Sequence, residues 1–150
     1  MIVFLSLGTN LGNRERNIKR ALCLLNIALG KRYKAVSDIV NTKAAGFDGP
    51  DFLNCVAAYD VRLAPGALLR RCKMVERLMG RRDAPEYAPD GTRVYHNRII
   101  DIDILLYGDM TVDEPGLKIP HPQLDNRPFF GEMIASIRAD LGLQEPGTTA

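Results

Sequence analysis

Hydrophobic residues recur along this chain with two different periods, and these periods predict where its strands and helices lie. Short continuous apolar runs bounded by turn residues are typical of buried strands. Four segments have this character: Ile2–Leu7, Tyr33–Val40, Phe52–Val61 and the second half of Asn97–Tyr107.

Two segments between these strands repeat their apolar positions with a period near 3.6, which predicts amphipathic helices. Asn13 can cap the first helix and Gly30 ends it. Its apolar positions are Ile18, Ala21, Leu22, Leu25, Ala28 and Leu29. Pro65 fits the first turn of the second helix, and Gly80 stops it. The buried stripe of that helix is Leu68, Cys72, Val75 and Met79. A short final helix is expected from about Pro128 to Ala139.

The predicted order is βαββαβ, which is typical of the ferredoxin-like arrangement. In that α+β fold, helices pack on one face of an antiparallel sheet. A chain of 150 residues is long enough to bury one proper core, so we expect a single domain over residues 1–150. Residues from about 142 to 150 are expected to form a flexible tail.

Three connections lack a regular pattern and are predicted to be loops. Asn41–Asp51 is rich in Gly, Ala, Asp and Pro. A turn at Gly108-Asp109 opens the second segment, which is irregular as far as Pro120. Arg81–Asn97 is polar and is interrupted by two prolines and a glycine. A long irregular stretch inside a compact domain is usually functional, so we expect Arg81–Asn97 to be a closing lid.

The strand within Asn97–Tyr107 carries the most informative polar residues. Side chains alternate along a strand, so Asp101 and Asp103 share one face while the isoleucines between and beside them share the other. Two neighbouring carboxylates repel each other unless a cation lies between them. Arg98, just upstream, adds a group suited to phosphate. Carboxylates for Mg²⁺ together with arginines for phosphate indicate phosphoryl-transfer chemistry.

The composition limits which kinds of partner the protein is expected to bind and in which compartment it is expected to lie. A net charge of +2 is too small to indicate a nucleic-acid partner. A basic run favours a solvated helix face; it consists of Arg70, Arg71, Lys73, Arg77, Arg81 and Arg82. The three cysteines, Cys23, Cys55 and Cys72, lie among apolar residues without C-x-x-C spacing, which predicts buried reduced thiols. With neither a signal sequence nor a membrane-spanning run, we expect a soluble cytoplasmic protein.

Several motifs, taken in order, resemble the 6-hydroxymethyl-7,8-dihydropterin pyrophosphokinase family of folate biosynthesis. The matching pieces are Leu7-Gly8-Thr9-Asn10-Leu11-Gly12, Thr42, Asp51-Phe52-Leu53-Asn54, Glu76 with Gly80-Arg81, Arg98 to Leu105, Ile119-Pro120-His121-Pro122 and Asn126-Arg127-Pro128-Phe129. Each piece alone is common, but the ordered set is specific and extends from the first strand to about Phe130.

The resemblance implies transfer of pyrophosphate from ATP to the pterin hydroxymethyl group, with release of AMP. It implies two Mg²⁺ ions held by Asp101 and Asp103, with Arg81, Arg98 and Asp101 as catalytic residues. The implied ATP-binding residues are Leu69, Lys73, Glu76, Arg81, Arg98, Ile104, His121 and Arg127. Lys73 and Glu76 lie three apart on one helix face, and a simple surface pair is the alternative. For His121 the alternative is a structural histidine.

The implied pterin-binding residues are Thr42, Ala45, Phe52, Asn54 and Phe129. Phe52 and Asn54 share a strand face, which places an aromatic ring beside an amide that can donate and accept hydrogen bonds. A flat aminopyrimidinone edge requires that combination. For the two phenylalanines, ordinary core packing is the alternative.

The chain departs from the family pattern at several positions. Lys43 stands where the family often has proline, and Lys73 where it often has glutamine. The lid lacks the usual tryptophan, so Tyr87 and Tyr95 are alternatives for the missing ring. Arg82 and Arg93 are further candidates for phosphate contacts within the lid.

Two other functions stay open at this point. One is a non-enzymatic ferredoxin-like module that binds RNA or a small effector, although such a module needs exposed aromatics rather than paired carboxylates. The other is an ATP-dependent phosphotransferase that releases ADP. If the chain is a pyrophosphokinase, we expect it to bind ATP and a reduced pterin. We further expect it to be a monomer that binds neither nucleic acid nor a membrane.

Overall fold

The fold is described from a computed structural model that covers residues 1–44, 49–81, 86–87, 89–91, 93–94 and 98–144. The helices are α1 (Arg14–Leu29), α2 (Pro65–Leu78), α3 (Gln123–Asn126) and α4 (Pro128–Leu141). The strands are β1 (Ile2–Thr9), β2 (Ala35–Val36), β3 (Val40–Thr42), β4 (Phe52–Asp60), β5 (Glu86–Tyr87), β6 (Arg93–Val94), β7 (Asp101–Tyr107), β8 (Val112–Glu114) and β9 (Leu117–Ile119).

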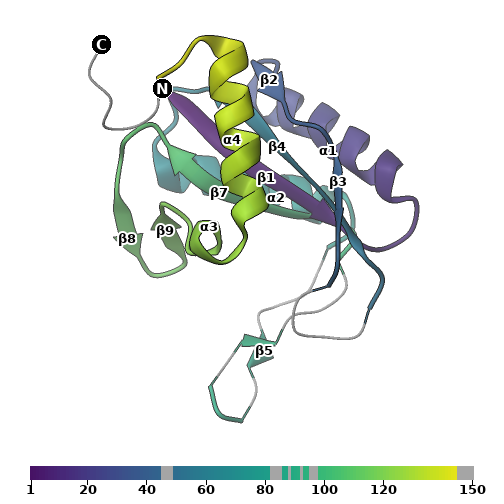
Figure 1. The fold of residues 1–150 in the computed structure, drawn as a ribbon. Helices are drawn as coiled ribbons and strands as arrows, with labels where there is room; N and C mark the ends of the chain where they lie inside the picture. Colours follow the sequence, from purple (N-terminus) through teal and green to yellow (C-terminus); the bar gives the residue numbers. More distant parts are fainter. Residues whose placement is uncertain (45–48, 82–85, 88, 92, 95–97, 145–150) are drawn as a thin grey trace.

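An antiparallel sheet with β1 near its centre forms the core of the molecule (Figure 1). The strand order is β2-β4-β1-β7, and β3 also pairs with β4. Ser6 of β1 lies opposite Val56 of β4 on one side and opposite Asp103 of β7 on the other. This order and the antiparallel pairing confirm the predicted ferredoxin-like α+β fold.

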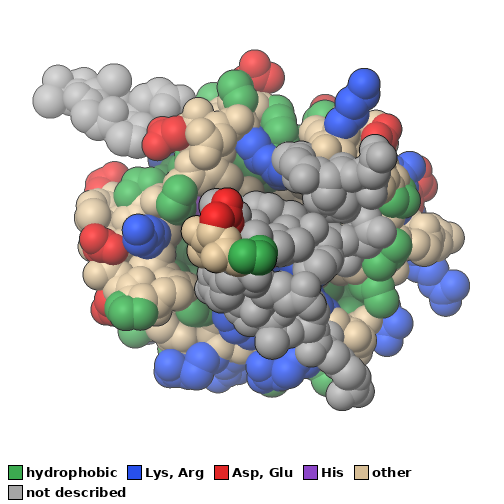
Figure 2. Space-filling model, turned by 90° about the horizontal axis from the view of Figure 1, so that it is seen from below, with side chains coloured by type: hydrophobic (Ala, Val, Ile, Leu, Met, Phe, Trp, Pro, Cys, Tyr) green, Lys and Arg blue, Asp and Glu red, His purple; other side chains and the backbone are tan. Residues whose placement is uncertain are grey.

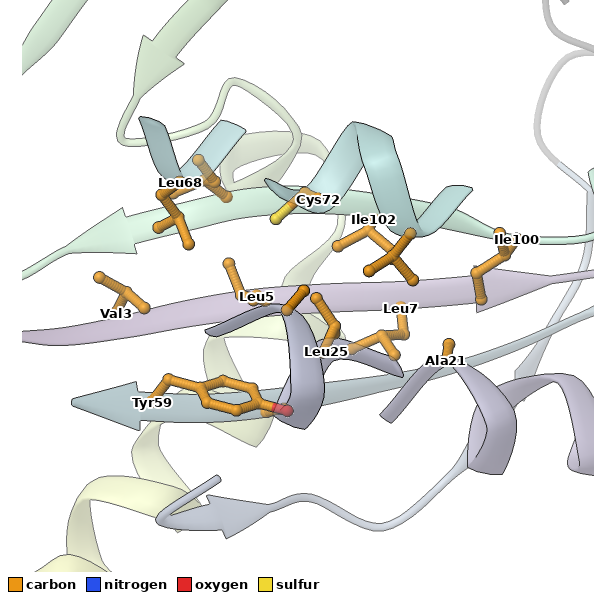
Figure 3. Close-up of a cluster of buried hydrophobic side chains, with 14 of the residues drawn as sticks. Val3, Leu5, Leu7, Ala21, Leu25, Tyr59, Leu68, Cys72, Ile100 and Ile102 are labelled. Carbon is orange, nitrogen blue, oxygen red and sulfur yellow. The ribbon is translucent and has the colours of Figure 1, made fainter. Parts of the chain in front are cut away.

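Both faces of the sheet are covered by helices. α1 and α2 pack on one face, where Leu5 and Leu7 of β1 are fully buried with Leu25 of α1 and Cys72 of α2 (Figure 3). α4 crosses the opposite face and buries Phe4 (Figure 1). The expectation of helices on one face is confirmed for α1 and α2 and wrong for α4, because the apolar residues of β1 alternate to both sides and each side requires a cover.

The helix α1 begins and ends at the predicted signals, whereas α2 begins at its predicted proline and ends at Leu78, two residues before the predicted stop at Gly80. The Asn13 side chain accepts a hydrogen bond from the backbone N–H of Arg16 at 3.1 Å, and Gly30 adopts a left-handed conformation with φ of 70° after α1. Pro65 is the first residue of α2. The predicted solvated face of α2 is confirmed for Arg70, Arg71, Lys73 and Arg77, which are all exposed. Lys and Arg side chains gather along the lower edge of the view in Figure 2.

The predicted strand Tyr33–Val40 is divided into β2 and β3. At the break, the Ser37 hydroxyl accepts a hydrogen bond from Val56 N–H at 2.8 Å, in place of a backbone carbonyl. When a side chain replaces a backbone group in the hydrogen bonds between two strands, the regular pairing of the strands is interrupted at that residue. β3 then continues to Thr42, so the predicted loop begins later than Asn41.

Three irregular segments contain structure that the pattern did not indicate. The chain from Gly108 to Pro120 folds into the β8–β9 hairpin, and β5 pairs with β6 inside the predicted lid. Gly142 caps α4 with φ of 68°, so the expected tail starts later than residue 142, and 145–150 lie outside the described residues. Within the described residues, no helix has the length and apolar character needed to cross a bilayer.

The cysteine prediction is confirmed for two residues of three. Cys55 and Cys72 are buried and unpaired, whereas Cys23 is exposed on α1. Cys23 points away from the sheet because it lies between the buried positions Ala21 and Leu25 of the helical stripe.

Candidate active site

A cavity of about 580 Å³ opens on the face of the sheet that α4 only partly covers. Its lining comes from β1, β4 and β7, from the β8–β9 hairpin, and from the chain between His121 and Phe130. Chain segments from both halves of the sequence therefore meet at one hollow.

The floor of this cavity is produced by a change from apolar to polar residues along single strands. On β1, Phe4 is buried under α4, whereas Ser6 and Gly8, on the same face, line the cavity. On β4, Val56 packs under α4 and Asn54 lines the cavity. On this face, α4 therefore covers the apolar part of the sheet and leaves the part with polar side chains open to the cavity.

Gly8 makes room for the Asn54 carboxamide. A Cβ atom at Gly8 would lie 2.8 Å from Asn54 Oδ1 and 3.6 Å from a ring carbon of Phe52. Asn54 is 3 % exposed, and its Nδ2 donates a hydrogen bond to Thr42 Oγ1 at 2.6 Å. The structure therefore brings together three of the predicted pterin-binding residues, Thr42, Phe52 and Asn54, at one end of the cavity.

The aromatic residue on the α4 side of the cavity differs from the prediction. Phe130 lines the cavity and is 1 % exposed, whereas Phe129 is half-buried and packs against the apolar cluster under α4. Their ring centroids lie 4.4 Å apart. The helical period marks Phe130 as buried, since it shares a stripe with Met133, Ile134 and Ile137 of α4, but it does not place the ring at the cavity. Ala45 lies outside the described residues.

Asp101 and Asp103 line the opposite end of the cavity floor, as the strand alternation predicts. The isoleucines on either side of them are buried on the other face of β7. Arg81 Nη1 donates to Asp101 Oδ1 at 2.8 Å. Gln123 Nε2 donates to Asp103 Oδ2 at 3.2 Å, and His121 Nε2 lies 3.7 Å from Asp103 Oδ1.

The surroundings of Asp103 disfavour its charged form. Burial, followed by repulsion from Asp101 and Glu76, raises the pKa of Asp103 well above its usual value. Among the described residues, no group of three or more His, Cys, Asp and Glu side chains could enclose a metal by itself. Two carboxylates facing a cavity fit Mg²⁺, which completes its coordination with water and phosphate oxygens.

Glu76 is a buried residue of the site rather than half of a surface pair with Lys73. Its carboxylate is 5 % exposed and accepts hydrogen bonds from Arg81 Nη1 at 2.7 Å and from Ile102 N–H at 2.8 Å. Burial and the nearby Asp101 charge raise the pKa of Glu76. Glu76 therefore joins α2 to β7 and holds the Arg81 guanidinium beside Asp101.

Most of the predicted ATP-binding residues surround a smaller cavity of about 120 Å³ beside the acidic pair. This set is Leu69, Lys73, Glu76, Arg81, Ile104 and His121. Arg98 and Arg127 line the larger cavity instead. The two cavities share Arg81, Asp101 and Asp103, so these residues lie where both meet.

Several positions that the sequence left open cannot be assigned a contact. Arg82 and Tyr95 lie outside the described residues, and Tyr87 and Arg93 are described only as backbone of β5 and β6. Lys43 is exposed at the end of β3. Among residues that the sequence did not single out, Ser6, Lys118 and Gln123 line the larger cavity, and so does Asn126 of the last matching motif. No periodic signal marks Lys118 and Gln123, because β9 and α3 are too short to show a period.

Comparison with known proteins identifies the relatives of this chain. A sequence model of the 7,8-dihydro-6-hydroxymethylpterin-pyrophosphokinase family matches residues 4–139. A Porphyromonas gingivalis protein named 2-amino-4-hydroxy-6-hydroxymethyldihydropteridine pyrophosphokinase is 40% identical over 147 residues, covering 97% of this chain and 96% of the relative. An Aquifex aeolicus protein of the same name is 38% identical over 129 residues, covering 85% of this chain and 74% of the relative. A folate synthesis bifunctional protein of Chlamydia muridarum is 39% identical over 143 residues, and the chain spans 30% of its length.

Proposed function

This chain belongs to the 7,8-dihydro-6-hydroxymethylpterin-pyrophosphokinase family, and we propose that the cavity over β1, β4 and β7 is where it transfers pyrophosphate from ATP to 6-hydroxymethyl-7,8-dihydropterin. The products are the pterin diphosphate and AMP, and the reaction is a step of folate biosynthesis. Family membership disfavours the two rival functions, an RNA- or effector-binding module and a phosphotransferase that releases ADP.

The position of Gly8 is the main support for placing both substrates in this cavity. Gly8 of β1 lies opposite Asn54 on one neighbouring strand and opposite Asp101 on the other. Adjacent strands are about 4.8 Å apart, so the two polar groups lie about 10 Å apart across a residue that has no side chain. A flat substrate held at Asn54 can extend across Gly8 toward the acidic pair.

The pterin is bound at the Asn54 end. The Asn54 carboxamide is held by Thr42 and can offer hydrogen-bonding atoms to an aminopyrimidinone edge. Phe52 and Phe130 line the same cavity and provide apolar faces for the ring. Phe129 reaches the pterin only if its ring leaves the cluster under α4. Ala45 remains a further proposed contact.

The triphosphate is bound at the end where the two cavities meet. Arg81 and Arg98 provide guanidinium groups for the β- and γ-phosphates, because these groups stay charged and match phosphate geometry. His121 and Arg127 line the approach to the phosphates. Leu69, Lys73 and Ile104, beside the smaller cavity, are proposed to contact the rest of the nucleotide.

Asp101 and Asp103 are proposed to hold two Mg²⁺ ions together with the triphosphate. When bound, such ions neutralise phosphate charge and polarise the phosphoryl group that is transferred. The protein's own contribution is to fix the carboxylates, through Arg81 on Asp101 and through Gln123 on Asp103. Glu76 holds Arg81 from the opposite side.

In the reaction, the hydroxymethyl oxygen of the pterin gives up its proton to solvent and forms a bond to the β-phosphorus. The bond between that phosphorus and the oxygen shared with the α-phosphate breaks, and AMP leaves. Asp101 accepts a hydrogen bond from the attacking hydroxyl and orients it. Arg81 and Arg98 stabilise the charge that develops on the transferred oxygens, so positioning and electrostatics supply most of the rate.

The protein is proposed to act as a monomer in the cytoplasm. The buried thiols Cys55 and Cys72 are unpaired. Unpaired thiols are typical of reducing compartments.

Metal removal tests the proposed cofactor. With EDTA in excess of divalent ions, turnover of ATP and the reduced pterin should stop, and added Mg²⁺ should restore it. The variants Asp101→Asn and Asp103→Asn should remain inactive at every Mg²⁺ concentration. Turnover that persists in EDTA, or near-wild-type turnover by either variant, would contradict the proposed cofactor or its ligands.

A further inference from the structure

Asn10 is a buried polar residue in the turn that follows β1. It is 2 % exposed, and its backbone N–H donates to the Arg98 carbonyl at 3.0 Å. In return, Asn10 Oδ1 accepts a hydrogen bond from Arg98 N–H at 2.7 Å. These two bonds continue the pairing of β1 with β7 beyond the ends of both strands. They fix the backbone from which the Arg98 side chain enters the cavity.

The other half of the same carboxamide reaches a different segment. Asn10 Nδ2 donates to the Pro50 carbonyl at 3.1 Å. Pro50 lies two residues before Phe52, where β4 begins. One side chain is therefore bonded to the chain just before β4, which carries Asn54, and to the chain just before β7, which carries Asp101.

A second side chain, that of Asn17, holds the same turn. Asn17 Nδ2 donates to Leu11 O at 2.8 Å and to Thr9 Oγ1 at 3.2 Å, so Asn17 ties the turn to the first helix. The three hydrogen bonds of Asn10 described above all lead to other segments. A carboxamide is suited to this role because its oxygen accepts from one segment while its nitrogen donates to the other.

We propose that Asn10 is a positioning residue that holds the pterin-binding end and the phosphate-binding end of the site at a fixed distance from each other. The proposal rests on the function proposed above for Arg98 and Asn54. Asn10 touches neither substrate in this account; it acts through Pro50 on one side and through the Arg98 backbone on the other.

Two substitutions distinguish the role of the Asn10 side-chain oxygen from that of its nitrogen. Asn10→Asp keeps an oxygen for Arg98 N–H but loses the donor to Pro50. Because the Pro50 carbonyl loses its donor and faces a carboxylate oxygen instead, KM for the pterin should rise about tenfold, while KM for ATP changes less than about threefold. Asn10→Ala loses both halves, so kcat should fall about tenfold and both KM values should rise. Asn17→Ala is the matched control in the same turn: it should lower Tm but leave all three constants within about threefold.

Amide hydrogen exchange provides a second readout that does not depend on turnover. In Asn10→Asp, exchange should accelerate at Phe52–Asn54 but not at Arg98, whereas Asn10→Ala should accelerate both. If the wild-type protein turns over and both Asn10 variants keep its kinetic constants, the inference is wrong while the proposed function stands. If Asn17→Ala reproduces the kinetic pattern of the Asn10 variants, or if exchange at both segments is unchanged, the inference is also wrong.

Discussion

Glu76 and Arg81 form a partly buried ion pair of 2.7 Å at the end of α2, and the same Arg81 nitrogen lies 2.8 Å from Asp101. Arg81 is thus held between a carboxylate from a helix and a carboxylate from the central sheet. Because Glu76 also accepts the Ile102 N–H, this arrangement couples the stability of the α2–β7 contact to the position of a phosphate-binding group.

Glu76→Ala should therefore affect both stability and nucleotide use. The substitution leaves Ile102 N–H without its acceptor and removes one partner of Arg81, which should lower the free energy of unfolding by about 2 kcal/mol. KM for ATP should rise as well, because Arg81 loses its orientation. Urea denaturation and steady-state kinetics measure the two effects. Lys73→Ala, at an exposed position of the same helix, should change the unfolding free energy by less than about 0.5 kcal/mol; equal effects from the two variants would contradict this account.

Gly8→Ala should weaken pterin binding. The added Cβ would lie 2.8 Å from Asn54 Oδ1, so the carboxamide must shift and its bond to Thr42 must lengthen. The loss of about 1 to 2 kcal/mol corresponds to a rise of about tenfold in KM for the pterin. Gly131→Ala is the control, since among the described residues no atom outside the adjacent backbone of α4 lies within 4 Å of the added Cβ. An unchanged pterin KM in Gly8→Ala would show that Asn54 does not bind the pterin.

Asp103 should make the ligand-free protein less stable as pH rises. Its pKa is raised in the folded state, so the folded protein binds this proton more tightly than the unfolded chain does. The resulting stabilisation is complete below the unfolded pKa of about 3.9 and is lost as pH rises through the higher folded pKa. Denaturant titrations across this range, without divalent ions, should show a steeper decline for the wild type than for Asp103→Asn. If the unfolding free energies of the two proteins change with pH in parallel, Asp103 is not the group responsible for the decline.

The parts of the structure that depend on local periodicity could be predicted from the sequence. The strand period alone places Asp101 with Asp103 and Phe52 with Asn54, and the caps at Asn13 and Gly30 mark the limits of α1. The break at Ser37 could not be predicted, because it depends on a hydrogen bond to a residue on another strand.

The remaining site residues depend on contacts between distant parts of the chain. Asn10 and Arg98 are 88 residues apart, and no local pattern indicates that their backbones pair. In the same way, the helical period places Glu76 near Lys73 but does not reveal that its carboxylate turns inward to β7. The choice of Phe130 over Phe129 as the cavity residue depends on how α4 lies across the sheet.

The products of the reaction test the central claim most directly. ATP, Mg²⁺ and 6-hydroxymethyl-7,8-dihydropterin are incubated with the purified protein, and nucleotides and pterins are separated and quantified over time. The account predicts AMP and pterin diphosphate in equal amounts, with no formation of AMP when the pterin is omitted. ADP as the stoichiometric product, or no conversion of the pterin, would contradict it.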